Sequence, residues 1–373
     1  MSDAPVQEAH PHVEDPDDEE APKVAITRRG ALLFGLFVAS AVAFLYFVLP
    51  KLTGLSETWS RLDNGDPLWL GAGVLFECVS FLGYVWLFRT VFVRGRSKVG
   101  WKASYQITMA GVAATRLFAA AGAGGIALTA WALRRSGMER RIVACRMVAF
   151  IVLLYTVYAL ALVLVGFGLY LGLFHGNAPF AITMIPAIVA SVAFVLVYTT
   201  ALIPQDVERR LAGWADGHGR VHRIIAKVAT APASVASGVR TAVDIVRDRE
   251  WGVLGAVLWW AGDIATLWAA FHAFGDHTPT IGIIIVAYFV GMLGNVLPLP
   301  GGIGGVDGGM IGAFAAFGVD FGLATVSVLT YRAFAFWLPT LPGAVAYLQL
   351  RKTVAGWRAE HRGEKSIAIL SEA

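Results

Sequence analysis

The hydrophobic residues of this chain gather in long runs separated by short polar segments. An α-helix needs ~20 apolar residues to cross the ~30 Å hydrocarbon core of a bilayer. Six runs reach that length and predict membrane-crossing helices at residues 30–49, 68–93, 142–173, 181–202, 251–274 and 322–349. The pattern therefore predicts an all-α polytopic membrane protein.

Two further apolar segments, residues 103–133 and 281–317, are interrupted by glycine and proline. Proline removes a backbone donor, and inside a bilayer every freed backbone group must find a partner within the protein. We therefore expect each segment to form a re-entrant hairpin of two half-helices that enters and leaves from one side. The residues expected to form the breaks are Gly122, Gly124, Gly125, Pro298, Pro300, Gly301, Gly302, Gly304 and Gly305.

The two interrupted segments resemble each other. When the chain is shifted by 180 positions, Gly111, Gly122, Gly124 and Gly125 coincide with Gly291, Gly302, Gly304 and Gly305. With a one-residue insertion, SGME at 136–139 then overlies FGVD at 317–320. Interrupted segments at matching places in two halves of a membrane protein point to inverted repeats and a transport site between them.

Charge gives the topology of the two halves. The first hairpin leaves through RRSGMERR at 134–141, whereas the second leaves through FGVDFG, which has no basic residue. Because basic loops stay in the cytoplasm, the two hairpins are expected to open on opposite faces of the membrane, with both termini inside. The expected layout is repeat 1 at 68–173 and repeat 2 at 251–349.

Composition supports this reading. Of the 373 residues 57% are hydrophobic and only 15% are charged, and the mean hydropathy is +0.64, too apolar for ordinary soluble domains. The net charge of +4 comes from short basic clusters between apolar runs, so we expect no nucleic-acid binding.

The polar segments complete the domain plan around a membrane domain at 30–350. Residues 1–29 form an acidic tail with too little apolar surface to fold, and residues 351–373 a basic tail; both are expected in the cytoplasm. The cytoplasmic interval 204–250 carries valines at helical spacing, which predicts amphipathic helices on the inner leaflet: Val235, Val239, Val243 and Val246.

The candidate site residues are five of the charged residues that fall within apolar segments. Glu77 and Asp263 lie near the middle of matching helices, where an ionised carboxylate must face the interior, be protonated or pair with a cation. Arg116 lies in the first hairpin, Asp307 in the second and Arg332 in the last crossing helix. A guanidinium can bind a phosphate with two parallel hydrogen bonds, so the arginines are candidate headgroup ligands. Alternatively, they neutralise the buried carboxylates, and both roles are compatible.

Motifs of soluble and membrane enzymes are missing. The sequence has no Walker loop, HExxH or GxSxG, and no paired-aspartate cluster for a metal. The glycine-rich stretch follows no predicted strand, so it does not indicate a nucleotide site. We expect no cofactor, no metal and no catalytic residue.

The stretch PLPGGIGGVDGG at 298–309, followed by Gly318-Val319 and Tyr331-Arg332, resembles the lysylphosphatidylglycerol synthase transmembrane-region family. LRRSGM at 133–138 is similar to that family's first motif, and the resemblance spans roughly residues 30–350. It implies a lipid flippase with two re-entrant hairpins that meet at the bilayer centre. Two positions depart from the family: Asp307 stands where Glu is common, and Ile151 where an arginine is usual, with Arg146 nearby.

The functional hypothesis is a lipid flippase or transporter-like protein of a bacterial inner membrane that moves an anionic or glycosylated headgroup. The expected partner is a phospholipid or a polyprenyl-linked lipid, and an oligomer is possible. One alternative is an intramembrane lipid-modifying transferase with Glu77 or Asp263 as base. The other is a non-transporting subunit that delivers lipid to a lipid-modifying enzyme.

Overall fold

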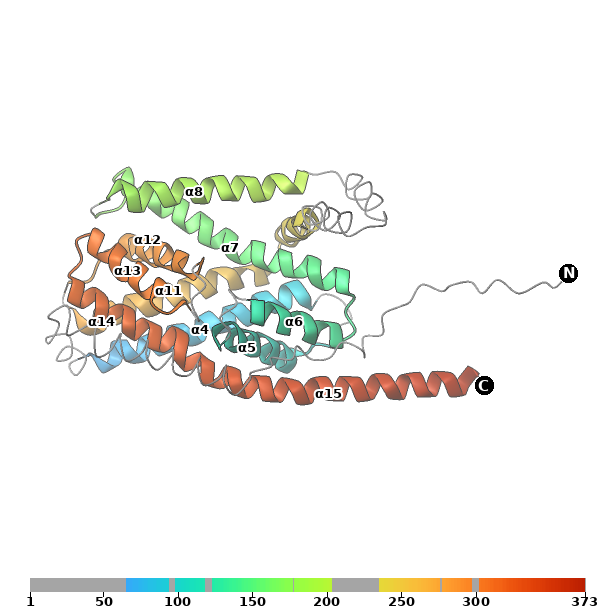
Figure 1. The fold of residues 1–373 in the computed structure, drawn as a ribbon. Coiled ribbons are helices and arrows are strands. Elements are labelled where there is room, and N and C mark those ends of the chain that lie inside the picture. Colours follow the sequence, from blue (N-terminus) through green and yellow to red (C-terminus); the bar gives the residue numbers. More distant parts are fainter. Residues whose placement is uncertain are drawn as a thin grey trace, which may run out of the picture.

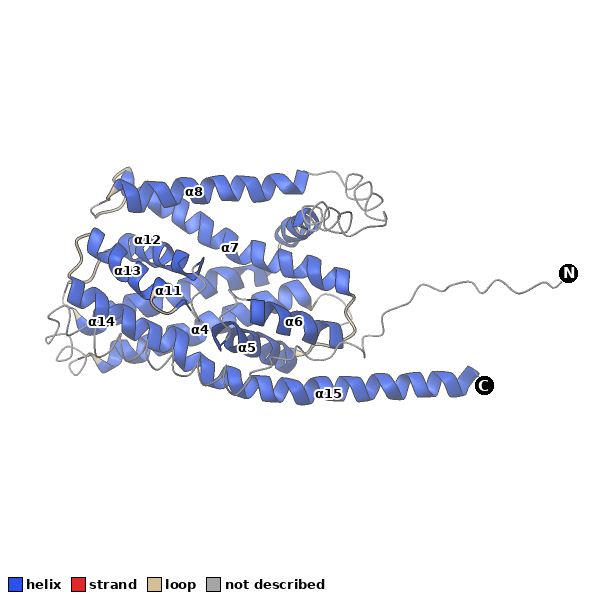
Figure 2. Ribbon diagram, viewed as in Figure 1, coloured by secondary structure: helices blue, strands red, loops and turns tan. Residues whose placement is uncertain are grey.

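The computed structural model describes residues 65–93, 98–117, 123–176, 178–202, 235–275, 277–296 and 302–372. Within these ranges the regular structure is entirely helical (Figures 1 and 2). The helices lie side by side in one bundle, and the last of them extends well beyond it (Figure 1). The predicted all-α class is confirmed.

Five helices are long and apolar enough to cross a membrane. They are α4 (Pro67–Phe92), α7 (Arg140–Tyr170), α8 (Phe180–Thr199, extended by a 3₁₀ turn to Leu202), α11 (Leu254–Phe274), and a last one built from α14 (Phe321–Arg332) and α15 (Leu338–Glu372). These match five of the six predicted crossings. The sixth, at 30–49, lies outside the described residues.

Helices α4 and α11 pack against each other through glycine. A Cβ added to Gly83 of α4 would lie 2.6 Å from the Leu258 Cβ and 2.8 Å from the Gly255 carbonyl oxygen. Only glycine permits such an approach of two backbones, as in other membrane helix pairs with small residues at the contact. The Ser80 hydroxyl donates to the Trp259 carbonyl at 2.8 Å across the same contact. The two helices run antiparallel and form the centre of the bundle.

The two interrupted segments form pairs of short helices, each packed antiparallel. The pairs are α5 (Trp101–Leu117) with α6 (Ala123–Arg135), and α12 (Ile281–Met292) with α13 (Gly305–Ala316). In the first pair a Cβ on Gly111 would meet the Thr129 hydroxyl at 3.1 Å, and in the second a Cβ on Gly291 would meet the Met310 amide at 2.8 Å. The glycines matched by the sequence shift therefore lie at equivalent helix contacts.

The turns that follow α6 and α13 share one conformation. Gly137 has φ 93° and Gly318 has φ 84°, which glycine adopts without strain. In each turn the next amide bonds to a carbonyl five residues earlier, at 3.2 Å and 3.0 Å. This is the hydrogen-bond pattern of a Schellman cap. The alignment of SGME with FGVD in the sequence corresponds to this repeated turn.

The packing partners of the two halves also correspond. Helix α5 lies along α15, at the end of the second half, and α12 contacts α7, at the end of the first half. The turns after α6 and α13 lie at opposite ends of the bundle (Figure 1). These relations support inverted repeats with re-entrant hairpins, which remain a prediction because they depend on where the bilayer lies.

Part of the interval before α11 is helical, and its position on the inner leaflet stays a prediction. Residues 235–247 form a helix, but Val235, Val243 and Val246 stay exposed while Val239 is buried. The buried side of this helix packs on α7, where the Cys145 thiol and the Thr241 hydroxyl are 3.2 Å apart. The rest of the interval, 203–234, lies outside the described residues.

The α4–α11 contact can be tested with Gly83→Ala. We expect this variant to lower the free energy of unfolding by about 1–3 kcal/mol, because its methyl group would overlap backbone atoms of α11. Gly71→Ala on the same helix is the matched control, since nothing lies within 4 Å of its added Cβ. Thermal melting in detergent measures both. Equal melting temperatures for the two variants would contradict the close packing.

The predicted orientation can be tested with single cysteines at the exposed N-cap positions that follow the two turns. Glu139→Cys and Asp320→Cys are introduced after Cys78 and Cys145 have been changed to serine. A membrane-impermeant maleimide should label position 320 from outside and position 139 only from the cytoplasmic side. Labelling of both from one side would rule out the inverted arrangement.

Candidate functional site

Three carboxyl groups lie buried in the interior of the bundle. Glu77 on α4 is 2% exposed, Asp263 on α11 is 5% exposed and Asp307 on α13 is 2% exposed. A carboxylate in such a place is tolerated only when hydrogen bonds or cations stabilise it. The partners of these groups come from both halves of the chain.

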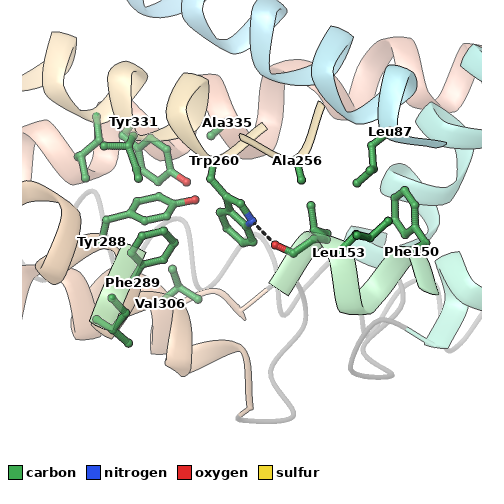
Figure 3. Packing of buried hydrophobic residues seen from close by; sticks show 14 of the residues in the cluster. Leu87, Phe150, Leu153, Ala256, Trp260, Tyr288, Phe289, Val306, Tyr331 and Ala335 are labelled. Atoms are coloured by element: carbon green, nitrogen blue, oxygen red, sulfur yellow. Dashed lines mark hydrogen bonds between the residues drawn. The ribbon is translucent and has the colours of Figure 1, made fainter. Parts of the chain in front are cut away.

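Asp263 accepts hydrogen bonds from two tyrosines of the second half. The Tyr331 hydroxyl on α14 donates to Asp263 Oδ2 at 3.1 Å, and the Tyr288 hydroxyl on α12 donates to the same oxygen. Both tyrosines are fully buried, and their hydroxyls lie close together (Figure 3). The aromatic layer around them is fixed by Trp260, whose indole N–H donates to the Leu154 carbonyl at 2.8 Å.

Glu77 lies beside Asp263 across the glycine contact of α4 and α11. The Thr266 hydroxyl is 3.3 Å from Glu77 Oε2, and the two carboxyl groups are within hydrogen-bonding reach of each other. Two facing carboxyls in an apolar interior can hold one proton between them. The structure thus brings together the two acids that the sequence placed at matching depths.

Asp307 and Arg332 form an ion pair between α13 and α14. The Arg332 Nε lies 2.7 Å from Asp307 Oδ1, while Asp307 Oδ2 accepts the Gly304 amide at 2.8 Å. Asp307 therefore caps the start of its own helix and also holds the last crossing helix. The shorter aspartate, which replaces the usual glutamate, reaches both partners.

Arg116 binds the backbone of the last crossing helix where that helix changes form. Residues Ala333–Trp337 form a π-helical segment between α14 and α15. Pro339 has no N–H, so the Ala335 carbonyl lacks its α-helical partner. Arg116 donates to that carbonyl at 2.5 Å and to the Phe336 carbonyl at 2.8 Å. The arginine satisfies backbone groups that the altered helix exposes.

The Phe336 ring lies near both arginines. The Arg332 guanidinium carbon is 4.7 Å from the ring centroid and that of Arg116 is 5.3 Å from it. Cations stack favourably on aromatic rings at such distances. The ring thereby keeps two positive groups, one from each half, close together in the interior.

The structure describes some of the glycines and prolines that were predicted to form the hairpin breaks. Gly302 and Gly304 adopt positive φ values of 67° and 84° just before α13, and Gly125 lies where α5 and α6 touch. Gly124 and Gly305 lie in the first turns of α6 and α13. Gly122, Pro298, Pro300 and Gly301 lie outside the described residues.

The first half lacks the arginine that the family resemblance implies. Ile151, which occupies the position equivalent to Arg332, is exposed on the surface of α7. Arg146 donates to the Phe92 carbonyl at 2.8 Å, at the end of α4. The second half alone thus has an aspartate and an arginine in this arrangement.

Sequence reasoning missed Tyr288, Thr266 and the role of Phe336. Their signal is weak, because a tyrosine or threonine in an apolar helix is ordinary until a partner is known. Tyr331 was noted only as part of a motif. The five charged site residues, in contrast, were identified from their position in apolar runs, and all five lie in this cluster.

Comparison with known proteins gives one family. Residues 32–343 match the sequence profile described as the lysylphosphatidylglycerol synthase TM region. A UPF0104 membrane protein of Methanothermobacter thermautotrophicus is 24% identical over 335 residues, which cover 85% of this chain and 94% of the relative. A UPF0104 membrane protein of Pyrococcus horikoshii is 28% identical over 100 residues, which cover 27% of this chain and 30% of the relative. Both relatives are archaeal and lend no support to a bacterial origin.

The Asp307–Arg332 pair can be tested by a double-mutant cycle. We expect Asp307→Ala and Arg332→Met each to lower the free energy of unfolding by about 3–5 kcal/mol, because each removes the counter-charge of a buried group. The double variant should lose much less than the sum, since no unmatched charge remains. Denaturant unfolding in detergent gives the coupling energy. Additive losses would show that the contact contributes nothing.

Proposed function

Because the chain belongs to the lysylphosphatidylglycerol synthase transmembrane-region family, we propose that it is a lipid flippase or transporter-like protein of the membrane. The observation that carries the proposal is the buried cluster of carboxyl, hydroxyl and guanidinium groups between the two helix pairs. Polar groups inside a membrane segment are costly and commonly mark the path of a substrate.

Arg116 and Arg332 are the proposed phosphate ligands. A guanidinium has five N–H donors in a planar fork, so an arginine that bonds a carboxylate or a carbonyl can also contact a phosphate. Asp307 orients Arg332, and the backbone of the π-helical segment orients Arg116. An anionic headgroup would pass between them while its acyl chains stay in the surrounding lipid.

Glu77 and Asp263 are proposed to balance the charge of that step. With Asp307 the cluster contains three acids against two arginines. A proton shared by the two carboxyl groups keeps the net charge of the cluster near zero. Release of that proton would offset the positive charge of an arriving headgroup amine. The hydroxyls of Tyr288 and Tyr331 provide neutral donors for the same negative charge.

The proposal is tested by reconstitution into liposomes that carry fluorescent phosphatidylglycerol or a polyprenyl-linked lipid. Quenching of the outer leaflet measures exchange between leaflets, with and without a proton gradient. We expect exchange to be faster than in empty vesicles for at least one lipid, and Arg116→Lys or Arg332→Lys to slow it about tenfold, because lysine keeps the charge without the fork.

Folding and chemistry need their own controls in this experiment. Arg89→Lys, near the end of α4 and away from the cluster, should exchange lipid at the wild-type rate, and each variant is checked for its melting temperature.

Mass spectrometry of the lipids separates a flippase from a transferase, because only an enzyme changes the lipid's mass. Wild-type protein that exchanges no lipid of an anionic and glycolipid panel would overturn the proposal in favour of a delivery subunit. If Glu77→Gln and Asp263→Asn are fully active, the two acids are structural.

A further inference from the structure

A second polar site lies where α6 ends beside α15, outside the buried cluster. A cavity of about 590 Å³ opens between the two helices. It is lined by Trp131, Arg135, Arg351, Val354, Ala355, Arg358 and Ala359. None of these residues belongs to the cluster proposed to move lipid. Arg351 lies 19 positions after Arg332, which corresponds to ~28 Å along a helix.

Three arginines line the cavity. Arg135 comes from α6, and Arg351 and Arg358 lie two turns apart on one face of α15. Among the side chains that the structure describes, no acidic one lines it. Arg135 is only 7% exposed, so its charge is held within the protein and not in bulk solvent. Three guanidinium groups around one cavity favour an anion with several acceptor oxygens.

Trp131 adds an aromatic ring to the cavity wall. Its indole nitrogen is buried and has no hydrogen-bond partner among the described residues. A buried donor without a partner costs free energy, and such groups are rare in folded proteins. Because this nitrogen has almost no accessible surface, the part of Trp131 that lines the cavity is its apolar ring.

An apolar stripe on α15 leads into the cavity. Leu341, Val345 and Leu348 are all exposed, at 70%, 53% and 60%. Their helical spacing continues through Ala355, which lines the cavity. A ligand that matches both features is amphiphilic, with an anionic head and an apolar body. Inorganic phosphate matches only the head.

We infer that this cavity binds the phosphate-bearing headgroup of an anionic phospholipid whose acyl chains lie along the apolar stripe of α15. This lipid would stay bound between α6 and α15, and it is distinct from the lipid proposed to pass through the central cluster. Basic pockets between membrane helices bind anionic headgroups by this combination of charge and burial. Since Arg135 ends α6 and both other arginines lie on α15, the bound lipid would fasten the first hairpin to the last helix.

The test is native mass spectrometry of the purified full-length protein titrated with phosphatidylglycerol or with phosphatidylcholine. We expect one phosphatidylglycerol to bind in preference to the zwitterionic lipid. The double variant Arg351→Gln/Arg358→Gln should weaken that binding about tenfold or more, because each basic group near an anionic headgroup contributes a severalfold gain.

Arg247→Gln is the control, since Arg247 is an exposed basic residue on the helix at 235–247 and does not line the cavity. It should bind phosphatidylglycerol like the wild type. Inorganic phosphate in the millimolar range separates the two sources of the anion: displacement of lipid shows a site for the phosphate group itself, and no displacement shows a site that needs the acyl chains. Equal binding by the wild type and the double arginine variant would overturn the inference. A loss of binding in Arg247→Gln as large as that in the double variant would also overturn it.

Discussion

The interior of this protein is organised by one requirement, which is that no charge or backbone group removed from water can remain without a partner. The Arg332–Asp307 pair shows the requirement most directly. Its two side chains neutralise each other, and Asp307 also caps the helix that carries it. A single carboxylate thereby fixes the glycine-rich turn, the start of α13 and the position of the last crossing helix.

The same requirement divides the bundle into a scaffold and a site. The α4–α11 contact is glycine-mediated, and at Gly83 and Gly255 its backbones approach too closely for side chains to intervene. Around it, the end of α5 carries Arg116 and the start of α13 carries Asp307 toward the interior. Rigid central helices and interrupted flanking helices together place groups from distant parts of the sequence at one point.

The sequence predicted much of this arrangement because long apolar runs, and charged residues within them, are easy to recognise in a membrane protein. Apolar runs gave the five crossing helices, and charged residues inside such runs gave Glu77, Arg116, Asp263, Asp307 and Arg332. Which groups these charged side chains contact could not be predicted in the same way. Nothing in the order of residues says that Arg116 bonds to the carbonyls of Ala335 and Phe336, since that contact depends on a local change of helix form.

Pro339 carries a consequence for how this sequence can change over evolutionary time. Its missing N–H withdraws the usual partner of the Ala335 carbonyl, and Arg116, from the other half of the chain, takes that place. If the proline were replaced, the new backbone N–H would compete with the Arg116 guanidinium for the Ala335 carbonyl oxygen. If the arginine were lost while the proline remained, that carbonyl would have neither donor. The two positions are therefore not independent: loss of the proline removes one of the reasons to keep the arginine, and loss of the arginine favours loss of the proline.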